Sequence, residues 1–123
     1  MKLLSQMTND EVSDALCIAA PAVQAIADDE QLVAEMQRVL PKGEHSKMDI
    51  YRFGVSRLAV LVPIILKTHR NDLFTVLSPF NGVSVEDCGK QGFLVTLGQV
   101  RELVKDKDFV DFFSSSFDMG QKA

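Results

Sequence analysis

The sequence is poor in the residue types that form disulfides, metal sites and aromatic boxes. Its 123 residues include no tryptophan, one tyrosine, two cysteines and two histidines. Two cysteines do not make a disulfide framework, which suits a reducing compartment. The longest apolar run, Leu58–Leu66, is about half the length that a membrane-spanning helix needs. The N-terminus offers only Leu3 and Leu4 in succession, so we expect no signal peptide and a cytoplasmic protein without membrane segments.

A basic surface for general nucleic-acid binding is also lacking, because the formal net charge is −4. The charge is uneven along the chain. Residues 1–45 carry three basic and eight acidic side chains, residues 46–75 carry five and two, and residues 76–123 carry five and seven. The positive middle can be a contact face, or it can simply offset the acidic first third.

Residues suited to catalysis do not cluster. His45 and His69 are far apart, and neither takes part in a metal-ligand spacing. Gly89–Gly92 resembles a phosphate-binding loop only superficially, because the upstream glycine, the strand and the following hydroxyl are missing. Cys88 has no base partner, so we interpret it as structural, and Cys17 as a core residue of an amphipathic helix. We therefore predict no enzymatic activity, no cofactor and no metal.

Helical signals begin early in the chain. Thr8 and Glu11 have the spacing of a capping box, and apolar residues follow at helical intervals. Pro21 should end this helix or begin the next, because proline lacks the N–H group that a helix interior uses. The pair Asp28–Asp29 should cap a further helix that ends at Pro41, before a polar loop.

The middle of the chain predicts a long buried helix over Met48–Thr68, apolar almost all round after Leu58. Pro63 lies inside it and should kink or split it. We expect Asn71 to cap the next helix. Asn81–Gly82 could form a hairpin turn, but the flanking residues favour a turn between helices, with Ser84 as the following cap.

The last third predicts one strong amphipathic helix and one short helix after a cap at Asp106. The apolar stripe of the first is Phe93, Leu94, Leu97, Val100, Leu103 and Val104. With no strand signal in the sequence, we predict an all-α fold: one compact domain over residues 1–123, a bundle of about six or seven helices, several of them short. Residues 1–7 and 118–123 should be frayed tails.

Two sets of residues are candidates for partner binding. The first is the phenylalanine stripe of the last helix, namely Phe109, Phe112, Phe113 and Phe117. This helix either folds back into the core or leaves part of its stripe exposed as a docking patch. The second is a basic belt around the central helix, made of Arg52, Arg57, Lys67 and Arg70. These residues mark where that helix leaves the core.

A resemblance adds to this interpretation. The stretch RFGVSRLAVLVPIILKTHRNDLFTVLSPFNGVSVED, followed by FLVTLGQVRELVKDKDFVDFF, resembles the tail assembly chaperones of long-tailed phages and prophages of Gram-positive bacteria. The shared pattern is Val62-Pro63-Ile64, then Asp72-Leu73-Phe74, then the Asn-Gly turn before Ser84, and finally a Leu/Val helix closed by Asp108 through Phe113. It covers roughly residues 48–117, and the opening MTNDEVSDALCIAAPAV more weakly.

The resemblance implies a protein without catalytic residues. Such a chaperone binds the tape-measure protein, a long and largely helical chain, and keeps it soluble while the tail tube assembles around it. It would act in the cytoplasm of the host cell. Homo-oligomers are also plausible, given the phenylalanine-rich last helix.

Two other classes of function remain open. A small regulator could contact nucleic acid or another protein through Arg52, Arg57, Lys67 and Arg70, although the overall acidity speaks against nucleic acid. A small enzyme would need a polar pocket with perturbed titratable groups.

Overall fold

The computed structural model describes residues 1–39 and 56–113, and these form a compact all-α fold, as the sequence predicts. The elements are η1 (Leu4–Gln6), α1 (Asn9–Ala27), α2 (Glu30–Arg38), α4 (Leu58–Asn81), α5 (Val85–Lys90) and α6 (Phe93–Lys105). Residues 107–113 are also helical, and we call them the terminal segment. In these two stretches of chain, no helix has the length and apolar character needed to cross a membrane.

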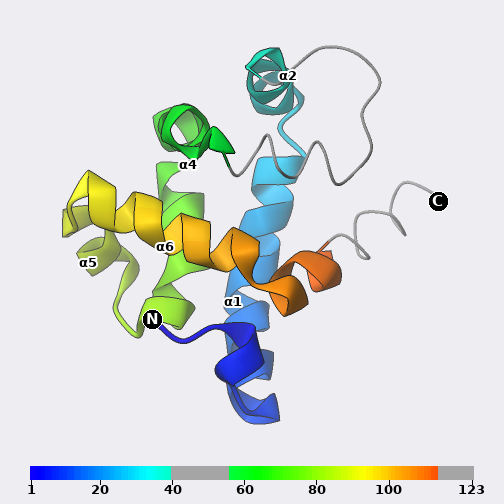
Figure 1. The fold of residues 1–123 in the computed structure, drawn as a ribbon, viewed down its shortest axis with the longest axis vertical. Coiled ribbons are helices and arrows are strands. Elements are labelled where there is room, and N and C mark those ends of the chain that lie inside the picture. Colours follow the sequence, from blue (N-terminus) through cyan, green and yellow to red (C-terminus); the bar gives the residue numbers. More distant parts are fainter. Residues whose placement is uncertain (40–55, 114–123) are drawn as a thin grey trace.

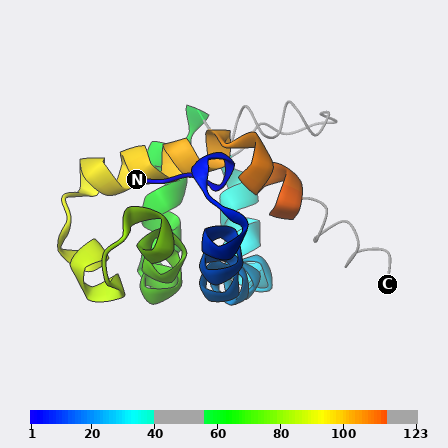
Figure 2. The ribbon, with the colours of Figure 1, turned by 90° about the horizontal axis from the view of Figure 1, so that it is seen from below.

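Two long helices set the frame of the fold. α1 and α4 lie side by side, and α6 crosses over both of them (Figures 1 and 2). α5 lies beside α4 near the start of α6, whereas α2 lies beyond the end of α1, next to the first half of α4 (Figure 1). The core is formed where these helices meet, by residues such as Ala19, Val62, Leu77 and Phe80.

α1 starts where the capping box predicts. The Thr8 hydroxyl accepts the Glu11 N–H, and the Glu11 carboxylate accepts the Thr8 N–H, both at 3.2 Å. The prediction that Pro21 would end this helix is wrong, because α1 continues across it to Ala27. Pro21 and Cys17 are both exposed, so the Cys17 carbonyl that loses its helical partner lies on the solvent side.

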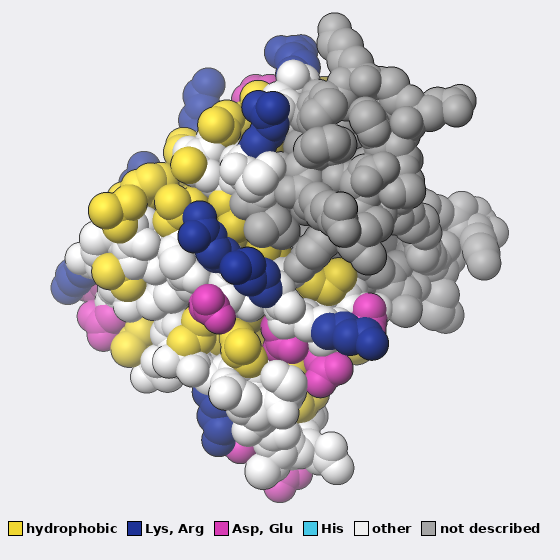
Figure 3. Space-filling view, in the orientation of Figure 1, with side chains coloured by type: hydrophobic (Ala, Val, Ile, Leu, Met, Phe, Trp, Pro, Cys, Tyr) yellow, Lys and Arg dark blue, Asp and Glu magenta, His cyan; other side chains and the backbone are white. Residues whose placement is uncertain are grey.

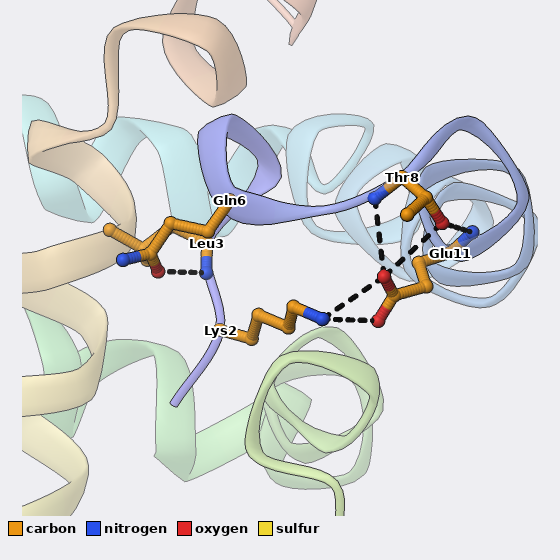
Figure 4. A network of polar contacts seen from close by, with 5 residues as sticks. All are labelled: Lys2, Leu3, Gln6, Thr8 and Glu11. Atoms are coloured by element: carbon orange, nitrogen blue, oxygen red, sulfur yellow. Dashed lines mark hydrogen bonds and ion pairs between the residues drawn. The ribbon is translucent and has the colours of Figure 1, made fainter.

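The first seven residues, expected to be frayed, are instead attached to the helices. The Lys2 N–H donates to the Phe80 carbonyl at 2.8 Å, and Leu4 is buried. The Lys2 ammonium also contacts the Glu11 carboxylate at 2.7 Å (Figure 4). The Leu3 N–H donates to the Gln6 side chain at 3.0 Å (Figure 4). This segment therefore connects the start of α1 to the end of α4.

The central helix differs from its prediction in where it bends. α4 runs through Pro63, so Pro63 does not split it. Two helical stretches meet instead between Thr68 and Asn71, where the sequence places the boundary between two helices, although Asn71 lies inside the second stretch and does not cap it. The bend is at His69, whose φ of −124° and ψ of 35° are not helical. The expected helix start at Met48 lies outside the described residues, as do the loop at 41–47 and the tail at 118–123.

The turn after α4 is the helix-to-helix turn that the sequence predicts. Gly82 has φ +69°, a left-handed conformation that only glycine adopts readily, and its N–H donates to the Ser78 carbonyl at 3.0 Å. Ser84 then caps α5, because its hydroxyl accepts the Asp87 N–H at 3.1 Å. Asp106 begins the terminal segment in the same way, accepting the Asp108 N–H at 3.3 Å.

Some predicted core positions are wrong. Val100 and Leu103 of α6 are buried, but Phe93 and Leu94 are 44% and 79% exposed. Cys17 is also exposed, on the face of α1 opposite Ala15 and Ala19. Cys88 is buried, as predicted.

Candidate functional site: an apolar groove between α1, α2, α4 and α6

One hollow in the described part of the molecule is an apolar groove of about 690 Å³. It lies where the end of α1 and α2 face α4, α6 and the terminal segment. Its lining residues are Val23, Gln24, Ile26, Ala27, Asp28, Val33, Met36, Ile65, Leu73, Val76, Leu77, Val100, Leu103, Val104 and Phe109. Only Gln24 and Asp28 in this lining are polar, so the groove suits an apolar occupant.

α2 forms one wall of the groove, so the shape of the groove depends on the position of this helix. Asp29 caps this helix by accepting the Leu32 N–H at 3.1 Å. Leu32 is the buried residue of α2, with 3% of its surface exposed. Val33 and Met36 are half-buried and face the groove. α2 has nine residues and only one buried side chain, so hydrophobic packing alone stabilises its position weakly. Polar contacts with the rest of the protein are therefore needed to hold it in place.

The floor of the groove is part of the core. Leu77 and Leu103 are almost fully buried and bring α4 and α6 together beneath the opening. Phe109 closes one end and packs edge-on against Phe80, with ring centroids 5.8 Å apart. The floor is therefore fixed by core packing, whereas the α2 wall is attached more lightly.

The phenylalanine stripe mostly folds back into the core, which is one of the two alternatives that the sequence left open. Phe113 is buried and its ring centroid lies 4.6 Å from that of Phe109. Phe112 is 42% exposed and stands edge-on to Phe113 at 5.1 Å. Phe117 lies outside the described residues. Phe109 is thus the member of the stripe that lines the groove, and Phe112 the member that faces solvent.

The basic belt is spread along α4 rather than gathered at one place. Arg57 precedes the first turn, and Lys67 and Arg70 lie one turn apart near the bend; all three are exposed. Lys67 is ten positions after Arg57, about 15 Å along the helix axis. Arg52 lies outside the described residues.

A second apolar surface lies apart from the groove. Hydrophobic side chains gather at the upper left of Figure 3, over the start of α6 and the first turns of α4. The large exposed hydrophobic residues of these two elements are Val60, Phe93, Leu94 and Val95. The sequence assigned Phe93 and Leu94 to the apolar stripe of this helix and so did not predict this surface.

His69, at the bend of α4, contacts two carboxylates. Its Nδ1 lies 2.7 Å from an Asp72 oxygen and its Nε2 lies 2.7 Å from an Asp29 oxygen. The Asp72 and Asp29 carboxylates raise the pKa of His69 above its usual value, against the opposing effect of burial. His69 in turn lowers the pKa of Asp29, with help from the Leu32 N–H. The interaction connects α4 to the start of α2.

Sequence reasoning missed this bridge for a clear reason. Asp72 follows His69 by three residues, a helical spacing that the sequence does show. Asp29 is forty residues away, so only the packing of α2 against α4 brings it to the ring. The groove is likewise assembled from three separate stretches of the chain, within residues 23–36, 65–77 and 100–109.

Other reactive groups are dispersed. The described residues contain no group of three His, Cys, Asp or Glu side chains placed to hold a metal ion. Burial raises the pKa of the Cys88 thiol, while its contact with Asn81 lowers it. A thiol in this environment is packed and unreactive.

Comparison with known proteins gives no relative: no protein-family model, no curated protein and no solved structure matches this chain.

Proposed function

We propose that the protein is a non-catalytic chaperone that holds an amphipathic helix of a partner in the apolar groove. The observation that carries the proposal is the groove itself, whose lining is apolar except for Gln24 and Asp28. Helix-in-groove recognition places a stripe of apolar side chains against such a lining. Each Å² of apolar surface removed from water contributes about 25 cal/mol.

The polar end of the groove restricts the occupant further. The Gln24 amide donates to one Asp28 oxygen at 2.7 Å, which orients this exposed carboxylate at the rim. Asp29 and Glu30 follow directly in the chain, so this end of the groove is acidic. We infer that the partner helix carries a lysine or arginine beside its apolar stripe, where an opposite charge fixes its orientation.

The resemblance to tail assembly chaperones gives this partner an identity. A tape-measure protein is a long helical chain that exposes apolar stripes before the tail tube surrounds it. A groove that accepts one such stripe would keep the client soluble during assembly. The proposed function is therefore a phage tail assembly chaperone whose client is the tape-measure protein.

The test is co-expression with overlapping fragments of a tape-measure protein, read by pull-down and by the soluble yield of each fragment. Ile26→Asp places a charge in the groove, at a half-buried position of α1. Ile18→Asp is the matched control, because Ile18 is 49% exposed on the same helix but outside the groove. We expect Ile26→Asp to lose capture of the fragment and Ile18→Asp to retain it, with both variants folded by circular dichroism.

Three results would contradict the proposal: no fragment is captured, both variants capture equally well, or both lose capture equally. Retention on DNA that falls steeply with salt, together with no capture of helical fragments, would favour the regulator instead.

A further inference from the structure

His69 is placed so that its charge decides whether α2 stays attached. Both ring nitrogens lie 2.7 Å from carboxylate oxygens, one from Asp72 and one from Asp29. A carboxylate oxygen can only accept a hydrogen bond, and a neutral imidazole has a single N–H to donate. Both bonds therefore exist together only when His69 is the imidazolium ion.

The two bonds are not equivalent mechanically. Asp72 lies on α4 itself, only three residues beyond His69, so the short length of chain between them keeps it near the ring. Asp29 is the cap of α2 and reaches His69 from another part of the chain. When the ring loses its proton, one of its nitrogens no longer carries a hydrogen, and its lone pair repels the carboxylate that it faces. One of the two hydrogen bonds is then lost. The Asp29 contact is the one that can separate.

The surroundings of His69 support this role. Only 14% of its side chain is exposed, compared with 30% for Asp29 and 34% for Asp72. Within the described parts of the chain, these two carboxylates are the charged groups that shift its pKa. The neighbouring charged residues are Asp28 and Glu30 on the α2 side, and Lys67 and Arg70 on α4. His69 is also the residue at which α4 bends, so the contact lies at a joint of the fold.

We propose that protonated His69 is a latch that holds α2 against α4, and that its deprotonation releases α2. α2 contributes Val33 and Met36 to the groove, so its release removes one wall. The consequence for a client rests on the proposed function, whereas the release of α2 does not. Raising the pH through the pKa of His69 would then open the groove, and lowering the pH through it would close the groove.

The experiment follows the latch directly in the full chain. Imidazole ¹⁵N NMR from about pH 5.5 to about pH 9 reports the protonation of His69, and hydrogen exchange reports the protection of α2 amides after correction for intrinsic rates. We expect the α2 amides to lose protection as His69 loses its proton, about tenfold for each unit by which the measured His69 pKa exceeds that of a free histidine. The amides of α6 should keep their protection.

Asp29→Asn is the informative variant, because asparagine caps a helix as well as aspartate does but carries no charge. In it we expect the His69 pKa to fall and α2 protection to be low and independent of pH. His45→Gln is the control and should behave as the wild type. The proposal is wrong if His69 titrates at its usual pKa, or if α2 protection does not follow its titration.

Binding of a tape-measure fragment separates the two proposals. If α2 is released as expected but no fragment binds at any pH, the latch stands and the proposed function fails. If a fragment binds equally at each pH and α2 protection does not change, the latch fails and the proposed function stands.

Discussion

Phe80 of α4 and Phe109 of the terminal segment meet edge to face, with ring planes at 76° and centroids 5.8 Å apart. Phe80 is 2% exposed, and the main-chain carbonyl of the same residue accepts the Lys2 N–H. Both termini of the described chain therefore meet at one residue of α4.

The first prediction concerns this pair. Phe80→Ala should lower the free energy of unfolding by about 3–5 kcal/mol, the usual cost of emptying a buried phenylalanine site. Phe109→Ala should cost less, because its ring is only partly buried. A double-mutant cycle by urea denaturation should give a coupling of about 0.5–1.5 kcal/mol. Additive single effects would show that the rings do not interact energetically.

The second prediction separates the two neighbouring phenylalanines of the terminal segment. Phe113→Asp should destabilise the fold by several kcal/mol, because it buries an unpaired carboxylate. Phe112→Asp should change the melting temperature much less, because Phe112 is 42% exposed. Thermal denaturation followed by circular dichroism is the measurement, and equal losses in the two variants would contradict the assignment.

The third prediction uses two glycines with open space around the missing Cβ. Gly82→Ala should cost about 1–2 kcal/mol, because alanine is strained at φ +69° even where nothing is within 4 Å. Gly98→Ala should stabilise the protein by about 0.5–1 kcal/mol, since Gly98 is inside α6 and also has room for a methyl group. Opposite signs in urea denaturation are the expected result. A neutral or stabilising Gly82→Ala would exclude the left-handed turn.

The fourth prediction concerns the two thiols. Cys17 is exposed and should react with a thiol reagent in the native protein, whereas Cys88 should react only on unfolding. Burial raises the Cys88 pKa and so lowers its thiolate fraction further. Mass spectrometry should therefore find one label per native chain. In the Cys17→Ser variant, the labelling rate of Cys88 should follow the rate of global unfolding. Rapid labelling of this variant would contradict the burial of Cys88.

The fifth prediction is the pH dependence of stability. The Asp72 and Asp29 carboxylates raise the pKa of His69 above 6.5. The contribution of protonated His69 to the free energy of unfolding is therefore complete below about pH 6.5 and is lost as pH rises through the folded-state pKa. His69 and the Leu32 N–H lower the pKa of Asp29 below 3.8, so that contribution is present above about pH 3.8 and is lost as pH falls through its folded-state pKa.

The difference in unfolding free energy between wild type and His69→Gln should therefore be largest between these two limits. Urea denaturation at a series of pH values measures it, with His45→Gln as the matched control. A difference that is the same at every pH would show that the charge of His69 does not stabilise the fold.

Local signals predicted three of the helix starts correctly. Thr8, Asp29 and Ser84 each accept the backbone N–H of a residue three positions later, and this spacing is visible in the sequence. Gly82 at the end of α4 was predictable for the same reason. Cap signals involve neighbouring residues only, so they need no knowledge of the tertiary fold.

The errors arose where tertiary packing decides the outcome. Pro21 should end a helix on propensity, but alanines 15, 19 and 22 are buried on the opposite face of α1, and packing against α4 keeps the helix continuous. Phe93 and Leu94 fit an apolar stripe, yet both are exposed in the first turn of α6. The groove and the Asp29–His69 contact depend on the position of α2, for which the sequence has no local signal.

The packing of α1 against α4 has a consequence for synthesis of the chain. The apolar face of α1, with Ala15 and Ala19, finds its cover in residues that follow Leu58. A ribosome must therefore translate at least the first turns of α4, and extend them beyond its exit tunnel, before that face is shielded from water. Until then the nascent chain exposes the apolar face of α1 to solvent, which makes early synthesis the stage most vulnerable to aggregation.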